Sequence, residues 1–390
     1  MDHIFNALIV LLSLSITLVR EEYRFFGLPY YDIVTVISTF LILISTLNRN
    51  RFSVSKGFLL RLGVLFATVM GVGSLSTLVG LQTIIREPNF GVLLRAAGSV
   101  LLFISTYVMI LGNERRVKLA ASSLVLVALV QGLVAIGEIG STSRFVGTFD
   151  DPNYFGVFQS MAFCIILSRL TGRTRFWEKL ILYALLALVG LSVLITFSRG
   201  AYLALFGGFA VIIWARLKNA KTQIVFVIGT AALGIWHSLS LLESLPIVQR
   251  FVGRLNIIEA IQTGGTGRTD IWKRAVLSLG NNPWGYGWGT ETVVLSGKVS
   301  HNVFLEVAIQ YGVIGFLLTI FLLGLIIGDA VHLVKKTENE YYIGFAASVI
   351  CVLVGGVSLN MWYVRQFWYV LAMCVALADN LRLREYSTST

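Results

Sequence analysis

The amino-acid sequence predicts an all-α polytopic membrane protein, in which about twelve helices cross the bilayer and one external loop forms a helical cap. Hydrophobic residues make up 56% of the chain and charged residues only 13%, whereas soluble proteins average about 25% charged residues. The mean hydropathy is +0.80. A helix needs about 20 apolar residues to cross the hydrocarbon core, and runs of that order recur along the whole chain.

Twelve apolar runs are long enough to be membrane spans. The predicted spans are 4–19, 31–47, 57–81, 91–112, 119–137, 154–170, 180–197, 201–216, 222–242, 302–333, 342–359 and 364–379. The run at 302–333 exceeds a straight crossing, which predicts an unwound or tilted portion at its start. We interpret the first run as a retained span, because no small-residue cleavage site follows it. Residues 1–390 are therefore expected to form a single transmembrane domain.

The distribution of lysine and arginine predicts which ends of the spans face the cytoplasm. Seventeen of these residues fall in one set of alternate loops and the C-terminal tail, against six in the short loops of the other set. Since Lys and Arg accumulate in cytoplasmic loops, both termini are expected to be cytoplasmic. Residues 243–301, between the ninth and tenth spans, then form an extracytoplasmic cap loop, whose six cations need a separate explanation.

The cap loop has helical patterning of its own. Residues 246–261 carry apolar side chains at helical spacing, which predicts a helix lying on the bilayer surface. The glycine-rich stretch 264–267 predicts a turn, followed by a second helix that starts near Thr269 and Asp270. The aromatic and glycine-rich residues 281–289 predict a loop that returns the chain to the membrane.

Two arginines on the predicted outer face are candidates for binding an anion. Arg199 lies between the seventh and eighth spans with almost no loop around it, and Arg268 follows the glycine-rich stretch. Exposed N–H groups of such a stretch favour an anion, and planar guanidinium groups match phosphate oxygens bidentately. The pair therefore suits a diphosphate. An arginine at a span end can also simply extend into the lipid headgroups, and that alternative stays open for Arg199.

His301 is the candidate proton acceptor of the cap loop. The ordinary pKa of an imidazole, about 6.5, suits it to take a proton from a hydroxyl nucleophile. A histidine that only hydrogen-bonds the start of the next helix is the alternative. Asn302 and Glu306 are spaced i,i+4, so they share a helix face and are candidates to orient the ring or bind sugar hydroxyls. Glu306 inside a span would be costly without such a role.

Four further residues are candidate substrate contacts, each with a structural alternative. Asp151 and Asn153 lie in a DDPN stretch that suggests a divalent ion beside a phosphate. Asp151 as an N-cap, with Pro152 at the first helical position, is the simpler account. Trp284 and Trp288 suit stacking on sugar rings, although such side chains more often form the aromatic belt at the membrane interface. No metal site is expected.

The order and spacing of these motifs resemble the O-antigen ligase and O-antigen polymerase superfamily of bacterial membrane proteins. The resemblance rests on GTFDDPNYFG, TFSRGAYLAL, GRTDIW, GYGWG and SHNVFLEVAIQYGVIG, within residues 145–325. The earlier spans agree in hydropathy alone. The resemblance implies a fold related to polytopic lipid-sugar glycosyltransferases, located in the bacterial cytoplasmic membrane with its active site on the outer face, and using neither metal nor cofactor.

The resemblance also implies a reaction and its residues. Members of the superfamily move a glycan from a polyprenyl diphosphate carrier to a hydroxyl on a glycan or lipid acceptor. By position, Arg199 and Arg268 would hold the diphosphate, and His301 would activate or orient the acceptor hydroxyl, with inversion at the anomeric carbon. Arg144 and Arg274 are secondary candidates. Membrane lipids are the expected surroundings, and no nucleic-acid partner is expected.

Two other classes of function compete with a glycan transferase. A transporter or flippase of lipid-linked glycans also needs many spans and a cationic site. It should, however, place ionisable residues near the bilayer midplane between repeats, and no internal repeat is evident. A non-catalytic membrane scaffold would leave the outward arginines and histidine without a purpose. Ligase and polymerase differ in the acceptor, and the sequence does not separate them.

Overall fold

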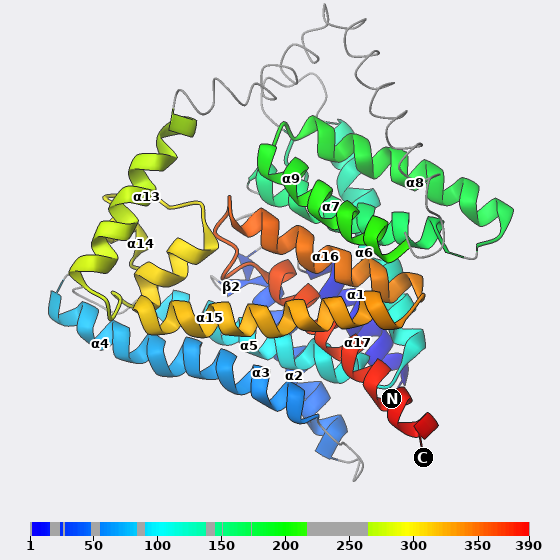
Figure 1. Cartoon of the computed structure of the whole chain (residues 1–390), viewed down its shortest axis with the longest axis horizontal. Helices are drawn as coiled ribbons and strands as arrows, with labels where there is room; N and C mark the ends of the chain where they lie inside the picture. Colours follow the sequence, from blue (N-terminus) through cyan, green and yellow to red (C-terminus); the bar gives the residue numbers. More distant parts are fainter. Residues whose placement is uncertain are drawn as a thin grey trace, which may run out of the picture.

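The computed structural model describes residues 2–15, 24–25, 28–47, 55–83, 90–137, 145–149, 151–172, 174–216 and 264–389. Its helices are α1 (Asp2–Ser15), α2 (Tyr30–Leu47), α3 (Lys56–Phe66), η1 (Ala67–Val72), α4 (Gly73–Thr83), α5 (Phe90–Ile110), α6 (Glu114–Gly137), α7 (Pro152–Leu170), α8 (Phe176–Ile195), α9 (Arg199–Arg216), α13 (Gly264–Asn281), α14 (Glu291–Val294), α15 (Val303–Lys336), α16 (Glu340–Gly356) and α17 (Arg365–Ser389). A short antiparallel pair, β1 (Arg24–Phe25) with β2 (Leu28–Pro29), accompanies them (Figure 1).

Eleven of the twelve predicted spans coincide with helices of the structure. The ninth, 222–242, lies outside the described residues, as do the surface helix expected at 246–261 and the first part of the cap loop. Helices long and apolar enough to cross a membrane are Lys56–Thr83, Gly91–Ile110, Glu114–Gly137, Phe176–Ile195 and Val303–Lys336. Shorter apolar helices are Phe5–Ser15, Ile33–Ile42 and Glu340–Gly356. The chain is thus a multi-pass membrane protein, and twelve crossings remain a prediction.

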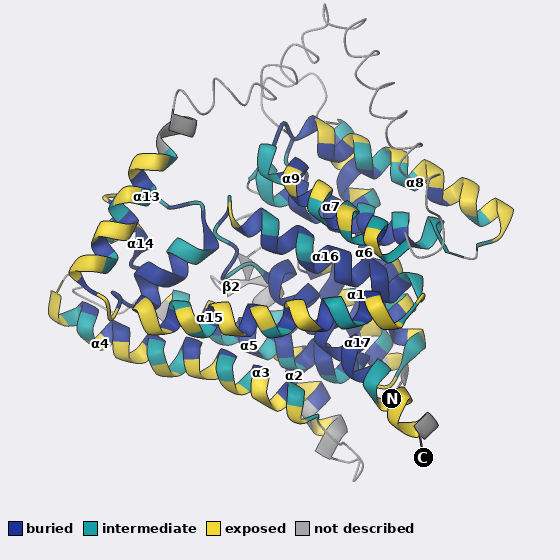
Figure 2. Ribbon diagram, in the orientation of Figure 1, coloured by how far each residue is buried: buried dark blue, intermediate teal, exposed yellow. Residues whose placement is uncertain are grey.

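The core of the bundle is centred on α16 and on α17 up to Asn380, where the side chains are buried almost all round (Figure 2). α16 packs against α7, α9, α15 and α17. Small residues permit these close approaches, as is usual between helices in membranes. A Cβ on Gly208 of α9 would overlap the sulfur atoms of both Cys164 in α7 and Cys351 in α16. The three cysteines, Cys164, Cys351 and Cys374, are buried and free.

The long helix α15 is broken at Gly312, where φ is +67° and ψ is −166°. Glycine adopts a positive φ without strain, so the residue type suits the break. The loop after α13 pairs with the backbone groups that the break releases. Gly287 N donates to Gln310 O at 2.8 Å, and Val313 N donates to Pro283 O at 2.9 Å. The span is therefore irregular, but at Gly312 and not at its predicted start, which is helical and capped by Asn302. The aromatic loop holds this break.

The other side of the same loop packs on the rod formed by α3, η1 and α4. Trp288 is 7% exposed, and its Nε1 donates at 3.2 Å to the carbonyl of Val69 in the π-helical segment η1. Ser76 Oγ donates to the Trp284 carbonyl at 2.6 Å. A Cβ on Gly73 would lie 2.5 Å from the Trp288 indole nitrogen. The loop is thus wedged between α15 and this rod.

The start of α13 differs from the prediction. The glycine-rich stretch 264–267 was expected to be a turn with a helix starting near Asp270, but the helix begins at Gly264. The prediction of a glycine turn before Arg268 is therefore wrong. Glycine disfavours a helix by only about 1 kcal/mol per residue relative to alanine. Burial of Ile271 and Ala275 in the cluster under the cap supplies the packing that favours the longer helix.

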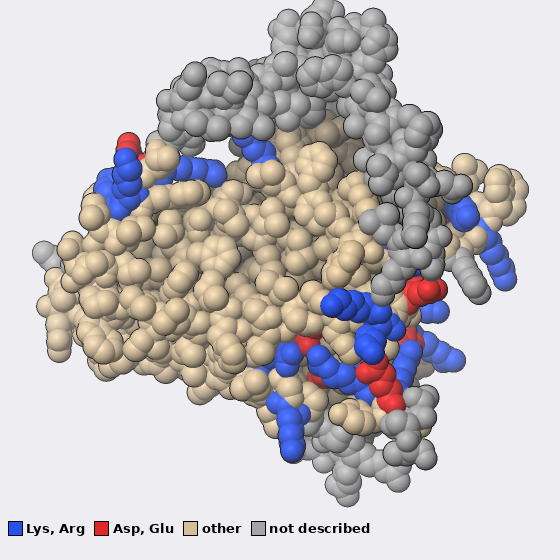
Figure 3. All heavy atoms as spheres, viewed as in Figure 1, with Lys and Arg blue, Asp and Glu red and all other residues tan. Residues whose placement is uncertain are grey.

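Charged side chains gather at two ends of the bundle, with an uncharged band between them (Figure 3). Both termini lie at one of these ends. The Arg116 guanidinium in α6 lies 4.3 Å from the Phe5 ring centroid in α1, and Arg384 near the C-terminus pairs with Glu114. We call this the basic end. The opposite end, which carries α13 and α14 and the starts of α7, α9 and α15, is the cap end.

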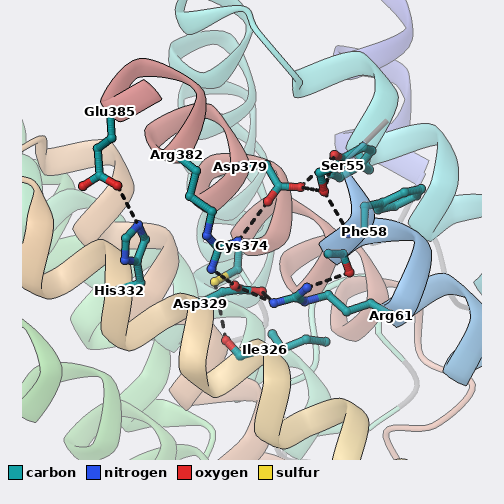
Figure 4. A network of polar contacts seen from close by, with 12 residues as sticks. Ser55, Phe58, Arg61, Ile326, Asp329, His332, Cys374, Asp379, Arg382 and Glu385 are labelled. Carbon is teal, nitrogen blue, oxygen red and sulfur yellow. Dashed lines mark hydrogen bonds and ion pairs between the residues drawn. The ribbon is translucent and has the colours of Figure 1, made fainter. Parts of the chain in front are cut away.

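An ion network at the basic end ties three helices together (Figure 4). Asp329 of α15 has no exposed surface and accepts hydrogen bonds from Arg61 of α3 and Arg382 of α17, both at 2.7 Å. Arg382 also donates to Asp379 at 2.9 Å, and the second oxygen of Asp379 accepts from Ser55. Each charge in this network has a partner of opposite sign, as buried charges require.

Candidate functional site

The candidate site is built around residues 357–360, between α16 and α17, which we call the hub loop. Arg268 of α13 donates from Nη1 to the Ser358 carbonyl at 3.5 Å. A Cβ on Gly200, at the start of α9, would collide with Ser358 Oγ, so the glycine lets α9 approach the loop closely. The turn that carries Arg199 and the side chain of Arg268 therefore meet at one loop, although they are far apart in the sequence.

Two more helices begin at the hub loop. Asn302, the residue before α15, donates from Nδ2 to the Val357 carbonyl at 3.0 Å. Tyr154, in the first turn of α7, donates from its hydroxyl to the Asn360 carbonyl at 3.0 Å. The N-termini of α7, α9 and α15 thus contact the same loop. Each brings the positive end of a helix dipole, which favours a negative ligand there.

Arg199 is the half-buried first residue of α9, as the sequence indicated. The Ser198 hydroxyl accepts from Ala201 N at 3.2 Å and caps the helix. A cation in the first turn of a helix opposes the helix dipole, by about 0.3–1 kcal/mol. An arginine here therefore adds to a positive potential instead of balancing it. An anion near the hub loop would be stabilised by both the Arg199 charge and the positive end of the α9 dipole.

Asp151 and Asn153 form the first turn of α7. Asp151 is the N-cap, its Oδ1 accepts from Asn153 N at 2.6 Å, and Pro152 follows as the first helical residue. This confirms the structural alternative for the DDPN stretch. The Asp151 carboxylate also acts electrostatically on Arg268, raising the pKa of that arginine against the lowering by burial.

His301 shares the electrostatic field of Arg268 and Asp151. Burial lowers the pKa of His301 below its usual value, and the nearby positive charge of Arg268 lowers it further, while Asp151 opposes both effects. The imidazole is therefore predominantly neutral at neutral pH and can accept a proton. The three groups, from α13, the loop before α15 and the start of α7, are within interaction range of one another.

The backbone at His301 is held in an unusual conformation. Its φ is +50°, in the left-handed region that few non-glycine residues adopt. The residues on either side are both fixed by hydrogen bonds: Ser300 N donates to Glu291 Oε1 at 2.7 Å, and Asn302 N donates to Asn360 Oδ1 at 3.0 Å. Among the described residues, none hydrogen-bonds the His301 imidazole itself. The loop therefore presents the ring while its own backbone is tied down.

The two polar residues after His301 are part of the scaffold. Asn302 is the N-cap of α15, and its Oδ1 accepts from the N–H groups of Phe304 and Leu305 at 2.9 and 3.1 Å. Glu306 is 4% exposed, and its Oε2 accepts from Trp362 N at 3.4 Å. Both side chains are buried. In this structure the two residues support the start of α15, and a contact with sugar hydroxyls stays a prediction.

The remaining candidates lie apart from this group of charges. Arg274 is further along α13 and donates to the Asp270 carbonyl at 3.4 Å. Trp284 is 54% exposed, whereas Trp288 is buried against η1, so its indole serves packing and is not presented to a sugar ring. Arg144 lies outside the described residues. In the part of the chain that the structure describes, no three His, Cys, Asp or Glu side chains form a cluster suited to a metal ion.

Two residues of the site were not identified from the sequence. Glu291 lies in the short helix α14, and Asn360 lies in the hub loop. No motif marked either of them. Asn360 is a polar residue directly after the span 342–359, and this position was a signal that could have found it. Glu291 lies inside the cap loop, where the sequence gives no such signal.

Comparison with protein families supports the resemblance that the motifs indicated. Residues 182–320 match the family model described as O-antigen ligase. This range includes α8, α9, α13, α14 and the first part of α15, and it therefore includes Arg199, Arg268, Glu291 and His301. Asp151 and Asn360 lie outside it. No protein with a curated function matches the chain.

Proposed function

Because residues 182–320 match the family model described as O-antigen ligase, we propose that the chain transfers a glycan from a polyprenyl diphosphate carrier to a hydroxyl acceptor. The family match supports a membrane glycan ligase or polymerase in general. The donor, the outer face of the bacterial cytoplasmic membrane and the metal-independent, inverting mechanism belong to our proposal. The observation that carries it is a convergence at the hub loop: the side chain of Arg268 and the start of α9, which begins with Arg199, both meet this loop, and its Asn360 holds the backbone next to His301.

The arginines would act on the leaving group. When the bond between the anomeric carbon and the diphosphate breaks, its electron pair goes to the diphosphate oxygen, where negative charge develops. Arg268, half-buried and bonded to one carbonyl at 3.5 Å, keeps guanidinium donors for such an oxyanion. Arg199 and the positive ends of three helices add to the same potential. Cations already aimed at developing charge stabilise a transition state without reorganisation.

The histidine would act on the acceptor. The hydroxyl oxygen attacks the anomeric carbon from the side opposite the diphosphate, and its proton passes to the neutral imidazole of His301. A single direct displacement inverts that carbon. Proximity to Arg268 favours the neutral imidazole, so one cation serves both the leaving group and the protonation state of the base. Asp151 would limit how strongly the local positive charge builds up.

The test is to replace Arg199, Arg268 and His301 singly by alanine and to measure glycan transfer from a polyprenyl-diphosphate donor in membranes. We expect each variant to lose most of its product, while Lys273→Ala, an exposed cation on α13, keeps it. Normal product from all three variants would contradict the mechanism. In liposomes, movement of the carrier-linked glycan across the bilayer without formation of a glycosidic bond would support the transporter instead.

A further inference from the structure

A buried carboxylate that the reaction does not use lies beside the His301 loop. Glu291, in α14, is 5% exposed. Its Oε1 accepts from Ser300 N at 2.7 Å, and its Oε2 accepts from the side-chain amide of Asn360. Among the described residues no Lys or Arg lies within ion-pair distance of it. A buried carboxylate is costly unless hydrogen bonds compensate it, and here both oxygens are used to hold other residues.

Asn360 continues this arrangement to the other side of the histidine. Its Oδ1 accepts from Asn302 N at 3.0 Å and from Ser300 Oγ at 3.4 Å. Ser300 Oγ lies 3.1 Å from the Asn302 carbonyl as well. The chain of bonds therefore runs from Glu291 through Asn360 to both neighbours of His301. It fixes the peptide unit between His301 and Asn302 and the unit that precedes Ser300, so the backbone is held on either side of the histidine.

The same asparagine lies in the loop that Arg268 contacts. Ser358, two residues before Asn360, offers its carbonyl to the Arg268 guanidinium. Tyr154 of α7 bonds the Asn360 carbonyl. A shift of Asn360 would therefore displace the supports of both the His301 imidazole and the Arg268 guanidinium. The left-handed φ of His301 needs such support, because the conformation is sparsely populated without it.

We propose that Glu291 and Asn360 form a positioning pair that sets His301 relative to Arg268 in the glycan-transfer reaction, without contacting the substrate. This inference rests on the proposed function. Burial raises the pKa of Glu291, and the donors from Ser300 and Asn360 lower it again, which is consistent with a carboxylate used as an acceptor. A reacting group misplaced by about 1 Å can lose about 100-fold in rate, so a positioning pair should affect turnover.

The pair can be tested by exchanging its donor and acceptor. In Glu291→Gln the new amide N–H would face the amide N–H of Asn360. In Asn360→Asp two carboxylates would face each other. The double variant Glu291→Gln/Asn360→Asp restores a donor opposite an acceptor, and its two Asp oxygens can still accept from Asn302 N and the new glutamine. We expect each single variant to lower kcat about 10- to 100-fold with little change in donor KM, and the double variant to recover most of kcat.

The control is Asp270→Asn, which removes an exposed cap carboxylate on α13 and should leave kcat unchanged. Thermal midpoints are measured for all variants. Unchanged kcat in Glu291→Gln, or a double variant that is as stable as wild type yet no more active than the single variants, would overturn the positioning pair. His301→Ala is assayed in parallel. If it retains full activity, the proposed function fails; if it is inactive while Glu291→Gln is normal, the positioning pair alone fails.

Discussion

The basic end and the cap end of the bundle hold similar charged side chains in different arrangements. At the basic end, Asp329 is enclosed by Arg61 and Arg382 at 2.7 Å, so opposite charges are in direct contact (Figure 4). At the cap end, Arg268 reaches a carbonyl at 3.5 Å, and its charge acts on His301 through space. The first group consists of closed pairs, whereas the second keeps donors and a neutral base close together without pairing them.

This contrast distinguishes the charged residues that stabilise the fold from those that can bind a ligand or react with it. In a closed buried pair the two charges compensate each other, and removal of one partner leaves the other charge uncompensated. A cluster with shifted pKa values and unused donors is typical of a site that meets a ligand. We therefore expect substitutions at the basic end to change stability, and substitutions at the cap end to change turnover.

The largest effect is expected for His301→Ala. Loss of a general base typically lowers turnover by about 10²- to 10⁴-fold. The matched control is His332→Ala at the basic end, where the ring lies 3.9 Å from Glu385 and is remote from the cap. We expect its turnover to be normal. The measurement is the initial rate of glycan transfer, normalised to folded protein. Equal rates for His301→Ala and His332→Ala would contradict the assignment of the chemistry to the cap end.

The next effect is on stability and is expected for Asp329→Ala. It leaves the 6% exposed Arg61 without its carboxylate, and breaking a buried pair in this way costs about 3–5 kcal/mol. Glu178→Ala, which breaks the more exposed pair with Arg169, is the control and should cost about 0–1 kcal/mol. Denaturation in detergent measures both. If Asp329→Ala and Glu178→Ala had the same denaturation midpoint, burial of the ion pair at the basic end would not contribute to stability.

A smaller effect is expected for Trp288→Phe. The substitution keeps an aromatic ring and removes the hydrogen bond from Nε1 to Val69 O in η1. Loss of such a bond costs about 0.5–1.5 kcal/mol. Trp284→Phe, at an exposed position, should cost nothing measurable. If Trp288→Phe instead left stability intact and raised the donor KM, the residue would belong with the sugar-binding candidates.

The smallest effect is a shift in the acid limb of the pH–rate profile. The neutral imidazole is the active form, so activity falls as pH drops through the pKa of His301, which lies below its usual value. Because Arg268 lowers this pKa, Arg268→Gln should move the midpoint to higher pH in the residual activity. Asp151→Asn should move it to lower pH, because Asp151 raises the pKa. Lys273→Gln should leave the midpoint in place, and shifts of the opposite sign would exclude His301 as the titrating group.

Helix positions could be predicted from the sequence because crossing a membrane is a local requirement. A run such as 57–81 is recognised as a span from its consecutive apolar residues alone, independently of the helices that pack against it. The motifs around Arg199, Arg268 and His301 could also be identified from the sequence, since each is a short polar stretch among apolar spans. An irregular portion of α15 was anticipated from its length, but it was expected at the start of the helix and lies at Gly312.

Tertiary structure decided the features that depend on partners far away in the chain. The helical state of residues 264–267 follows from packing under the cap, which outweighs the low helix propensity of glycine. Trp288 became a packing residue because η1 offers a carbonyl to its indole. Glu291 and Asn360 became the supports of His301 only when α14 and the hub loop came together. The sequence by itself therefore determined most of the helical segments and which residues are candidates for the chemistry, because hydropathy and charge are local. The folded chain decided how those residues are held, because hydrogen-bond partners and close contacts exist only once distant helices are packed.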